Sequence, residues 1–368
     1  MNIAFQSNLF WGAGLAFILI AARKKHTGGD FMEKCIKKDG REEKPEKARF
    51  VIVGSGWRAA FYVRVAKAFP ERFELLYMLC RTPEKAEKRA AELGIPTTTS
   101  ADDCINAHPD FVVVAVTKPS MSQVSLEWLG RGFFVIAETP AALDFGTIGK
   151  LESLGEKGKR LIIAEQYRLY PEYDAILSAV RKGLIGEPTA LNISIAHDYH
   201  AASLIRAFLK IPLGMKFSVR AKTYEFPTTE TMTRYERFTD GRVAEKKRTV
   251  ATFEFENGKA AFYDFDSEQY RSPIRKNALK IQGIRGEIIG RQAYFLDEQN
   301  EAREIEIGFK KSSLDQDETA ISVLMQRAVA YMRGKGSHPY PLEEAVRDSY
   351  MAILMQRAAC TGETVNGE

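Results

Sequence analysis

The chain has 368 residues, of which 45% are hydrophobic and 27% charged, a composition typical of globular proteins. A chain of this length is too long to fold around one compact core, which predicts two domains. The formal charge is +5, but residues 1–47 hold nine Lys and Arg against six Asp and Glu, so the rest contributes only +2. The charge balance therefore gives no indication of nucleic-acid binding. The four cysteines have no Cys-x-x-Cys or metal-ligand spacing, which indicates reduced thiols of a cytoplasmic protein and no metal.

The N-terminal segment stands apart from the rest. Residues 1–22 carry no charge, and residues 9–22 are an unbroken apolar run followed by Arg23-Lys24-Lys25. The run is shorter than the roughly 20 residues of a membrane span and lacks the basic start of a secretory signal. Two interpretations stay open: an N-terminal anchor that leaves the rest in the cytosol, or an upstream extension with Met32 as the true start. Both predict that residues 1–47 lie outside the fold.

Residues 49–59 contain the most informative motif. Residues 49–53 predict a buried parallel strand, the segment 54–56 a tight glycine turn, and Ala59 the start of a helix. Glycine at these positions allows the turn and lets a pyrophosphate approach the backbone, and the helix N-terminus favours its negative charge. We therefore predict a dinucleotide site formed by Gly54, Ser55, Gly56, Trp57 and Arg58.

The exit of the second strand, residues 72–79, bears on the choice of cofactor. NAD-binding units usually place Asp or Glu here to hold the ribose 2′-hydroxyl. This chain has Cys80, followed by Arg81 and Thr82. Because Arg81 can grip a 2′-phosphate that a carboxylate would repel, we predict NADP, with NAD possible. The alternative is that Arg81 is a solvated residue at a helix start.

Three further apolar runs, residues 111–116, 133–137 and 161–164, predict strands of the same parallel sheet. Ligands bind such sheets at the carboxyl ends of the strands. The polar residues at these ends are therefore candidates. We expect the cofactor to contact Thr117, Lys118, Pro119, Glu138 and Thr139, and the substrate site to include Tyr167, Arg168 and Tyr170.

Beyond residue 170 the pattern changes to alternating strands. The dipeptide Asn257-Gly258 between two of them predicts a hairpin, and helices are expected at 319–332 and 342–360. The second domain is therefore predicted to be α+β with a mostly antiparallel sheet. We expect a dinucleotide-binding domain at 48–168, a substrate and oligomerisation domain at 169–340, and a C-terminal helix and tail at 341–368. The predicted strands are 189–195, 217–226, 249–255, 260–265, 279–284, 293–296 and 304–307.

Several of these motifs, in this order, resemble the glucose–fructose oxidoreductase, inositol dehydrogenase and rhizopine-catabolism (Gfo/Idh/MocA) family. The matching segments are VIVGSGWRA at 51–59, CRTPEKAEKRAAELGI at 80–95, DFVVVAVTKPS at 110–120, AETPAAL at 137–143, GLIGEP at 183–188 and PLEEAVRD at 341–348. The resemblance implies an α/β Rossmann domain with a doubly wound parallel sheet, followed by an open-faced α+β sheet domain. It also implies a sugar or polyol substrate and pairing through that sheet into homodimers or homotetramers.

The family's catalytic residues are only partly present. Its Glu-Lys-Pro reads Glu138-Thr139-Pro140 here, and a threonine has no accessible pKa for the lysine's proton chemistry. His200 falls on the family histidine, but the family aspartate position is Ala196. One of the three catalytic positions is therefore retained.

The run His197-Asp198-Tyr199-His200 offers its own chemistry. We expect His200 to act as general acid or base, oriented by Asp198 or Tyr199. The alternatives are a metal held by the two histidines together with Asp198, and a histidine that only packs at the helix start. A second polar-aromatic cluster follows a later strand and includes Tyr270. We therefore expect substrate contacts from Asp198, Tyr199 and Tyr270.

Two function hypotheses follow from these residues. The first is an NADP-dependent oxidoreductase that moves hydride between nicotinamide and a hydroxyl or keto carbon of a sugar, cyclitol or related polyol. His200 is the first candidate for the proton, Tyr167 or Tyr199 the second, and Thr139 an orienting hydrogen-bond partner. The alternative is a nucleotide-binding regulatory or structural protein that kept the fold and lost turnover.

Overall fold

The computed structural model describes residues 46–368, which form one compact unit. The predicted anchor and the alternative start at Met32 lie outside the described residues. Within residues 46–368, none of the helices combines the length and hydropathy needed to cross a membrane.

The first sheet has six parallel strands in the order β3-β2-β1-β4-β5-β6. Order and direction are those of a doubly wound nucleotide-binding sheet, so every strand ends at the same edge. The strands are β1 (Ala48–Val53), β2 (Phe73–Leu79), β3 (Thr97–Thr98), β4 (Phe111–Val114), β5 (Phe134–Ala137) and β6 (Leu161–Ile163).

Helices cover both faces of this sheet. Phe50 and Ile52 of β1 share one core cluster with α1 and the distant α8, whereas Val51 and Val53 share the other with α4, α5 and the first part of α9. Alternate β1 side chains therefore face opposite layers, as the pleat requires. The helices of this half are α1 (Ala59–Ala68), α2 (Pro83–Leu93), α3 (Ala101–Asn106), α4 (Lys118–Gly130), α5 (Phe145–Glu152) and the 3₁₀ turn η1 (Gly155–Arg160).

The second sheet has nine strands in the order β14-β13-β12-β11-β7-β10-β9-β8-β15. All its neighbours are antiparallel except β7 and β10, which run parallel. The strands are β7 (Pro188–Ser194), β8 (Phe217–Thr229), β9 (Val243–Phe255), β10 (Ala260–Asp266), β11 (Ala278–Gly283), β12 (Gly286–Ile289), β13 (Gln292–Leu296), β14 (Ala302–Glu306) and β15 (Val365–Gly367).

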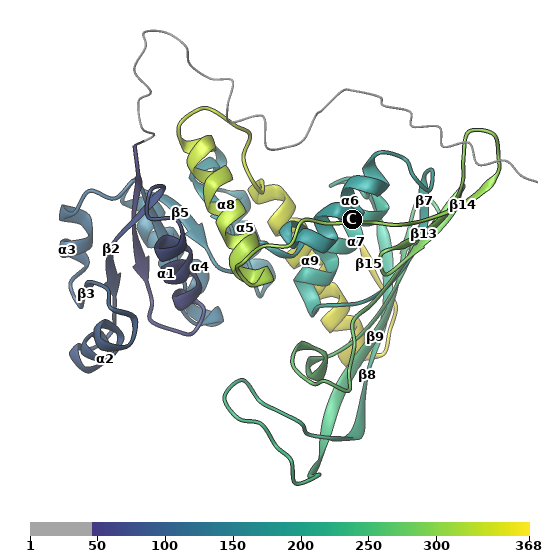
Figure 1. The fold of residues 1–368 in the computed structure, drawn as a ribbon, viewed down its shortest axis with the longest axis horizontal. Helices are drawn as coiled ribbons and strands as arrows, with labels where there is room; N and C mark the ends of the chain where they lie inside the picture. The colour runs from purple at the N-terminus through teal and green to yellow at the C-terminus, as the bar shows by residue number, and fades with distance from the viewer. Residues whose placement is uncertain (1–45) are drawn as a thin grey trace, which may run out of the picture. The chain divides into compact units, whose positions relative to one another are not determined.

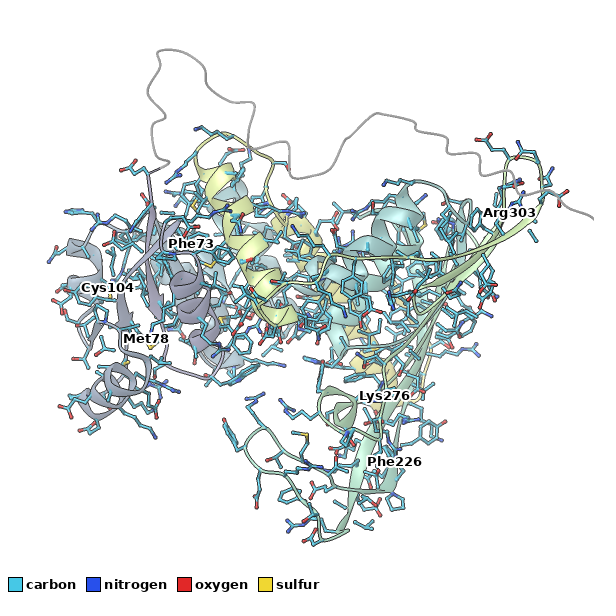
Figure 2. The ribbon with its side chains drawn as sticks, viewed as in Figure 1. Phe73, Met78, Cys104, Phe226, Lys276 and Arg303 are labelled. Atoms are coloured by element: carbon cyan, nitrogen blue, oxygen red, sulfur yellow. The ribbon has the colours of Figure 1, made fainter. Side chains whose placement is uncertain are left out.

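Helices α6, α7 and α9 pack on one side of this sheet, and β8 and β9 extend as a long hairpin (Figure 1). Figure 2 shows Phe226 on that hairpin and Arg303 toward the opposite end of the sheet. The remaining elements are η2 (Tyr167–Leu169), α6 (Pro171–Arg181), α7 (Asp198–Leu209), η3 (Ser267–Tyr270), α8 (Gln316–Met332) and α9 (Leu342–Thr361).

The fold class predicted from the sequence is confirmed, and its differences have physical reasons. Strand β9 begins at Val243, whereas the predicted start was 249. The first half of the strand is charged and carries no apolar alternation, so the sequence carries no strand signal there. Helix α8 begins at Gln316 instead of 319 because the Asp315 side chain accepts a hydrogen bond from the Glu318 N–H and caps it. Strands β3, β12 and β15, of two, four and three residues, were not predicted.

Candidate functional site

The glycine turn after β1 leaves room for a phosphate. Gly54 has φ +110, and a Cβ there would lie 2.4 Å from the Ala115 carbonyl oxygen. A Cβ on Gly56 would meet nothing nearer than 4.0 Å, so its space is free for a ligand. No side chain caps the following helix α1, which leaves its N-terminus available to an anion. The residues fit a dinucleotide pyrophosphate.

Arg58 lies just beyond this turn but points into the protein. Its Nε donates to Glu138 at 2.8 Å, and a second nitrogen lies 3.0 Å from Asp317. The Tyr62 hydroxyl also donates to Glu138, at 2.7 Å. The structure therefore places Arg58 and Glu138, both predicted to contact the cofactor, in a buried ion-pair network that fixes the ends of β1 and β5.

The exit of β2 holds the residues predicted to select the cofactor. Cys80 is buried and Arg81 exposed. Arg81 makes no hydrogen bond or ion pair with residues 46–368, so its guanidinium is available to a ligand. The Thr82 hydroxyl accepts a hydrogen bond from the Lys85 N–H at 3.4 Å and caps α2. Arg81 is therefore the better of the two candidates for a 2′-phosphate.

The ends of β4, β5 and β6 lie side by side, as predicted. Thr117 is the N-cap residue of α4, its hydroxyl 3.3 Å from that of Ser120, and Lys118 and Pro119 begin that helix. Thr139 follows β5 and is buried, and Glu165 follows β6 and is buried too. The N-terminus of α7 meets these strand ends through its two histidines, His197 and His200.

His200 is bound to Glu165. Its Nδ1 lies 2.6 Å from Glu165 Oε2, and the Tyr167 N–H donates to Oε1 at 2.9 Å. His200 is 4% exposed, and its ring packs against those of Tyr167 and Tyr199 at 4.4 and 4.5 Å between centroids. The prediction that Asp198 or Tyr199 orients His200 is therefore wrong: Glu165, 35 residues away in the sequence, reaches Nδ1 from the end of β6.

Burial shifts the pKa values of this pair in opposite directions. Desolvation raises the pKa of Glu165 to about 8 and lowers that of His200 to about 3. Both pKa shifts arise because a buried site disfavours the charged form of each group. Burial therefore favours an uncharged pair, with the proton on Glu165 and a neutral imidazole at His200.

His197 forms a second cluster beside this pair. Its Nδ1 contacts the Tyr270 hydroxyl, and its Nε2 lies 3.0 Å from the Tyr199 hydroxyl and 3.4 Å from Lys118 Nζ. Burial lowers the pKa of His197 to about 2, with His200 and Lys118 adding to the effect. The imidazole is therefore neutral, with both nitrogens in contact with polar groups.

The remaining predicted residues are placed differently. Arg168 donates to Ser203 at 2.7 Å and lies 3.6 Å from Asp348, and the Tyr170 hydroxyl donates to Asp317 at 2.7 Å. These contacts tie η2 to α7 and α9 and the start of α6 to α8, so the structure does not present Arg168 and Tyr170 to the histidine cluster. Asp198 has φ +43, and burial raises the pKa of its carboxyl while the Lys118 charge opposes that shift.

Two site residues were not assigned from the sequence. Glu165 was only one of the polar residues that follow the predicted strand 161–164, and His197 was only a possible metal ligand. Across residues 46–368, no three His, Cys, Asp or Glu side chains meet as a metal site. Ala196, at the family aspartate position, is fully buried in the apolar core. The signal for Glu165 was its position, because it ends a parallel strand as Thr139 does.

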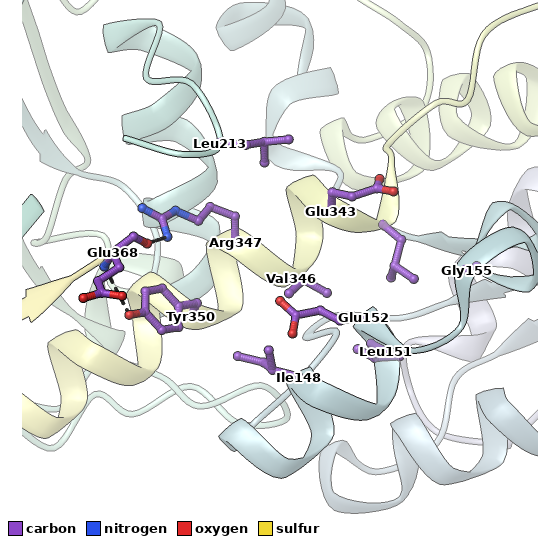
Figure 3. Close-up of a pocket in the computed structure, with 12 residues that line it drawn as sticks. Ile148, Leu151, Glu152, Gly155, Leu213, Glu343, Val346, Arg347, Tyr350 and Glu368 are labelled. Carbon is purple, nitrogen blue, oxygen red and sulfur yellow. Dashed lines mark hydrogen bonds between the residues drawn. The ribbon is translucent and has the colours of Figure 1, made fainter. Parts of the chain in front are cut away.

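A pocket of about 490 Å³ lies elsewhere, between α5 and α9 (Figure 3). Ile148 and Leu151 line it from α5, Arg347 and Tyr350 from α9, together with Glu368. None of the predicted site residues lines it, and it offers no histidine. The candidate site therefore lies at the strand ends and not in this pocket.

Comparison with known proteins bears on the first domain. Residues 48–166 match the Gfo/Idh/MocA family model, described as an oxidoreductase family with an NAD-binding Rossmann fold. The first domain is thus that of an NAD-binding oxidoreductase. Over residues 48–166 this match confirms the resemblance seen in the sequence.

Two curated relatives match part of the chain. The oxidoreductase ORF334 of Rhizobium meliloti is 28% identical over 148 residues, 39% of this chain and 44% of that protein. Glucose-fructose oxidoreductase domain-containing protein 2 of Xenopus laevis is 29% identical over 140 residues, 37% of this chain and 36% of that protein. The chain thus spans less than half the length of these relatives.

Solved structures share the fold over most of the chain. An Agrobacterium radiobacter oxidoreductase in complex with NAD+, L-tartaric acid and magnesium has a TM-score of 0.67 at 15% identity, covering 87% of this chain and 98% of that one. A myo-inositol dehydrogenase from Corynebacterium glutamicum has a TM-score of 0.63 at 16% identity, covering 88% and 99%. At such identities the likeness establishes the two-domain fold.

Proposed function

We propose that this protein is an NADP-dependent oxidoreductase that acts on a hydroxyl or keto carbon of a sugar, cyclitol or related polyol. The observation that carries the proposal is the 2.6 Å contact between Glu165 and His200 at the strand ends of a Rossmann domain. Arg81, which has no partner among residues 46–368 and follows β2, supports the preference for NADP. Support for a polyol comes from the family and from the hydroxyl-rich surroundings of His197.

The residues divide the work as follows. Gly54, Gly56 and the start of α1 would hold the dinucleotide pyrophosphate, and the bound nicotinamide would accept or return the hydride at C4. In the oxidative direction, starting with Glu165 ionised and the ring proton on Nδ1, His200 Nε2 would accept the proton of the substrate hydroxyl while the Nδ1 proton passes to Glu165. Both groups are then uncharged, the state that burial favours.

A nucleotide-binding protein without turnover is the second candidate. The absence of the family lysine and aspartate, at Thr139 and Ala196, favours it. The two functions are separated by measuring NADPH oxidation with a panel of ketoses and inososes, and NADP+ reduction with the matching polyols. Saturable cofactor binding without turnover on any member would replace the oxidoreductase proposal by the binding one.

The second sheet supports a homo-oligomer. Tyr224, Val250, Phe262, Ile289 and Tyr294 are large, exposed and, by strand register, on the same open face. Apolar side chains gathered on one sheet face are typical of an interface. We propose a homodimer or homotetramer formed through this face, in a cytoplasmic protein, with sedimentation velocity as the test. Phe262→Glu should yield monomers.

A further inference from the structure

Lys118 lies beside the place that the family lysine would occupy. It begins α4 after β4, and Thr139 follows β5, which pairs directly with β4 through Val114 and Ala137. Tyr199 connects the two positions: the Lys118 ammonium is 5.3 Å from its ring centroid, and the Thr139 hydroxyl acts on the pKa of its phenol. A lysine on the neighbouring strand end thus reaches the same cluster.

The ammonium of Lys118 is held by weak partners. Its polar contact is with His197 Nε2 at 3.4 Å, beside the Tyr199 ring. Among residues 46–368 it has no carboxylate within salt-bridge distance, although the charge of Asp198 acts on it. Desolvation lowers the pKa of Lys118. A cation that faces neutral aromatic groups can still accept an oxygen ligand.

From this geometry we propose that Lys118 performs the task for which the family uses the lysine missing at Thr139: its ammonium binds the reacting oxygen of the substrate. The inference rests on the proposed oxidoreductase function. It assigns Lys118 a role in chemistry instead of the cofactor contact predicted from the sequence. His197 and Tyr199 act as positioning residues that hold the ammonium at the cluster.

The proposed reaction uses the nicotinamide cofactor of the proposed function and three side chains, those of Lys118, His200 and Glu165. In the reductive direction hydride adds to the carbonyl carbon, and the C=O π pair moves to oxygen. The negative charge that develops there faces the Lys118 ammonium. The oxygen takes its proton from His200 Nε2, and His200 Nδ1 recovers one from Glu165. The contribution expected of Lys118 is to stabilise this developing negative charge with a fixed cation.

The first test separates chemistry from cofactor binding. Lys118→Met should lower kcat about 10²–10³-fold with NADPH affinity nearly unchanged, and Lys118→Arg should retain part of the activity. The double variant Lys118→Met with Thr139→Lys returns a lysine to the neighbouring strand end and should recover part of the lost kcat. Full activity of Lys118→Met, or a loss confined to NADPH affinity, would overturn the proposal and leave the oxidoreductase function standing.

The second test uses the wild-type protein and needs no turnover. Trace acetic anhydride labels unprotonated amines, and peptide mass spectrometry reads the rate at each lysine. Lys118 should react faster than the exposed Lys335 at neutral pH, because its pKa is lowered. Saturating NADP+ should then protect Lys118 about tenfold, because the nicotinamide would cover it, and leave Lys335 unchanged.

This second result also distinguishes the two proposals. If no polyol or ketose is turned over, the proposed function fails, and labelling alone decides whether Lys118 faces the cofactor. Equal labelling of Lys118 with and without NADP+ would show that its ammonium lies away from the reacting centre, which overturns the inference whatever the activity.

Discussion

Glu165 places its Oε2 atom 2.6 Å from Nδ1 of His200, and both side chains are buried at the ends of the parallel strands. The Glu165 carboxyl group fixes the ring so that Nε2 is the nitrogen left for a substrate. This is the arrangement of an acid or base with its orienting group. In this chain it is built from the end of β6 and the start of α7.

We expect the two residues to act as a unit. Removing a general acid or base typically costs about 10²–10⁴-fold in rate, so His200→Ala should lower kcat by that order with NADPH affinity preserved. Glu165→Gln should lower kcat as well, because the proton relay ends there. The double variant should cost little more than His200→Ala alone. Additive losses in steady-state kinetics would show that the residues work separately.

The same pair predicts how stability depends on pH. The pKa of Glu165 is raised from 4.5 to about 8 in the folded protein, so its contribution is full below pH 4.5 and is lost as the pH rises to about 8. The pKa of His200 is lowered from 6.5 to about 3, so its contribution is full above pH 6.5 and is lost in acid. The two slopes oppose each other between pH 4.5 and 6.5.

The loss from Glu165 should therefore be visible between pH 6.5 and 8, at no more than about 1.4 kcal/mol per pH unit. Glu165→Gln should flatten this part of the curve when urea unfolding is measured across the range. The exposed Glu298→Gln is the matched control and should leave the slope unchanged. A wild-type free energy of unfolding that stays constant from pH 6.5 to 8 would contradict the raised pKa.

A third prediction concerns the cofactor. Losing a charge-assisted contact to phosphate costs about 1.5–3 kcal/mol, so Arg81→Ala should weaken NADPH binding about tenfold or more and leave NADH nearly unchanged. Lys88→Ala, an exposed change on α2, is the control. Fluorescence titration with both cofactors measures the effect. Equal losses for NADPH and NADH would mean that Arg81 does not read the 2′-phosphate.

The sequence predicted the strand ends well, because buried parallel strands are apolar throughout and end at one edge. It could not predict which polar group faces which. Asp198 was the nearest carboxylate to His200 along the chain, yet Glu165, which follows β6, reaches Nδ1 instead.

Arg168 was likewise predicted to contact the substrate. Its buried partners, Ser203 and Asp348, come from α7 and α9, which are distant in the sequence. Such pairings depend on packing between distant segments. No periodicity in the sequence encodes them.

The last prediction concerns the β8–β9 hairpin, whose tip reaches the glycine turn. The Arg234 guanidinium lies 3.8 Å from the ring centroid of Trp57, and Trp57 also packs edge-on against Phe61 at 5.3 Å. A cation–π contact at an exposed site is worth about 0.5–1 kcal/mol, so Arg234→Ala should weaken NADPH binding about two- to fivefold by freeing Trp57.

Arg237→Ala removes the same charge from the same tip without touching Trp57 and serves as the control. Titration of NADPH against both variants, with Trp57→Phe to identify the tryptophan signal, measures the contribution of the contact. Should Arg234→Ala and Arg237→Ala weaken NADPH equally, the tip would act through its overall charge, and the stacked pair would have no part in holding the cofactor loop.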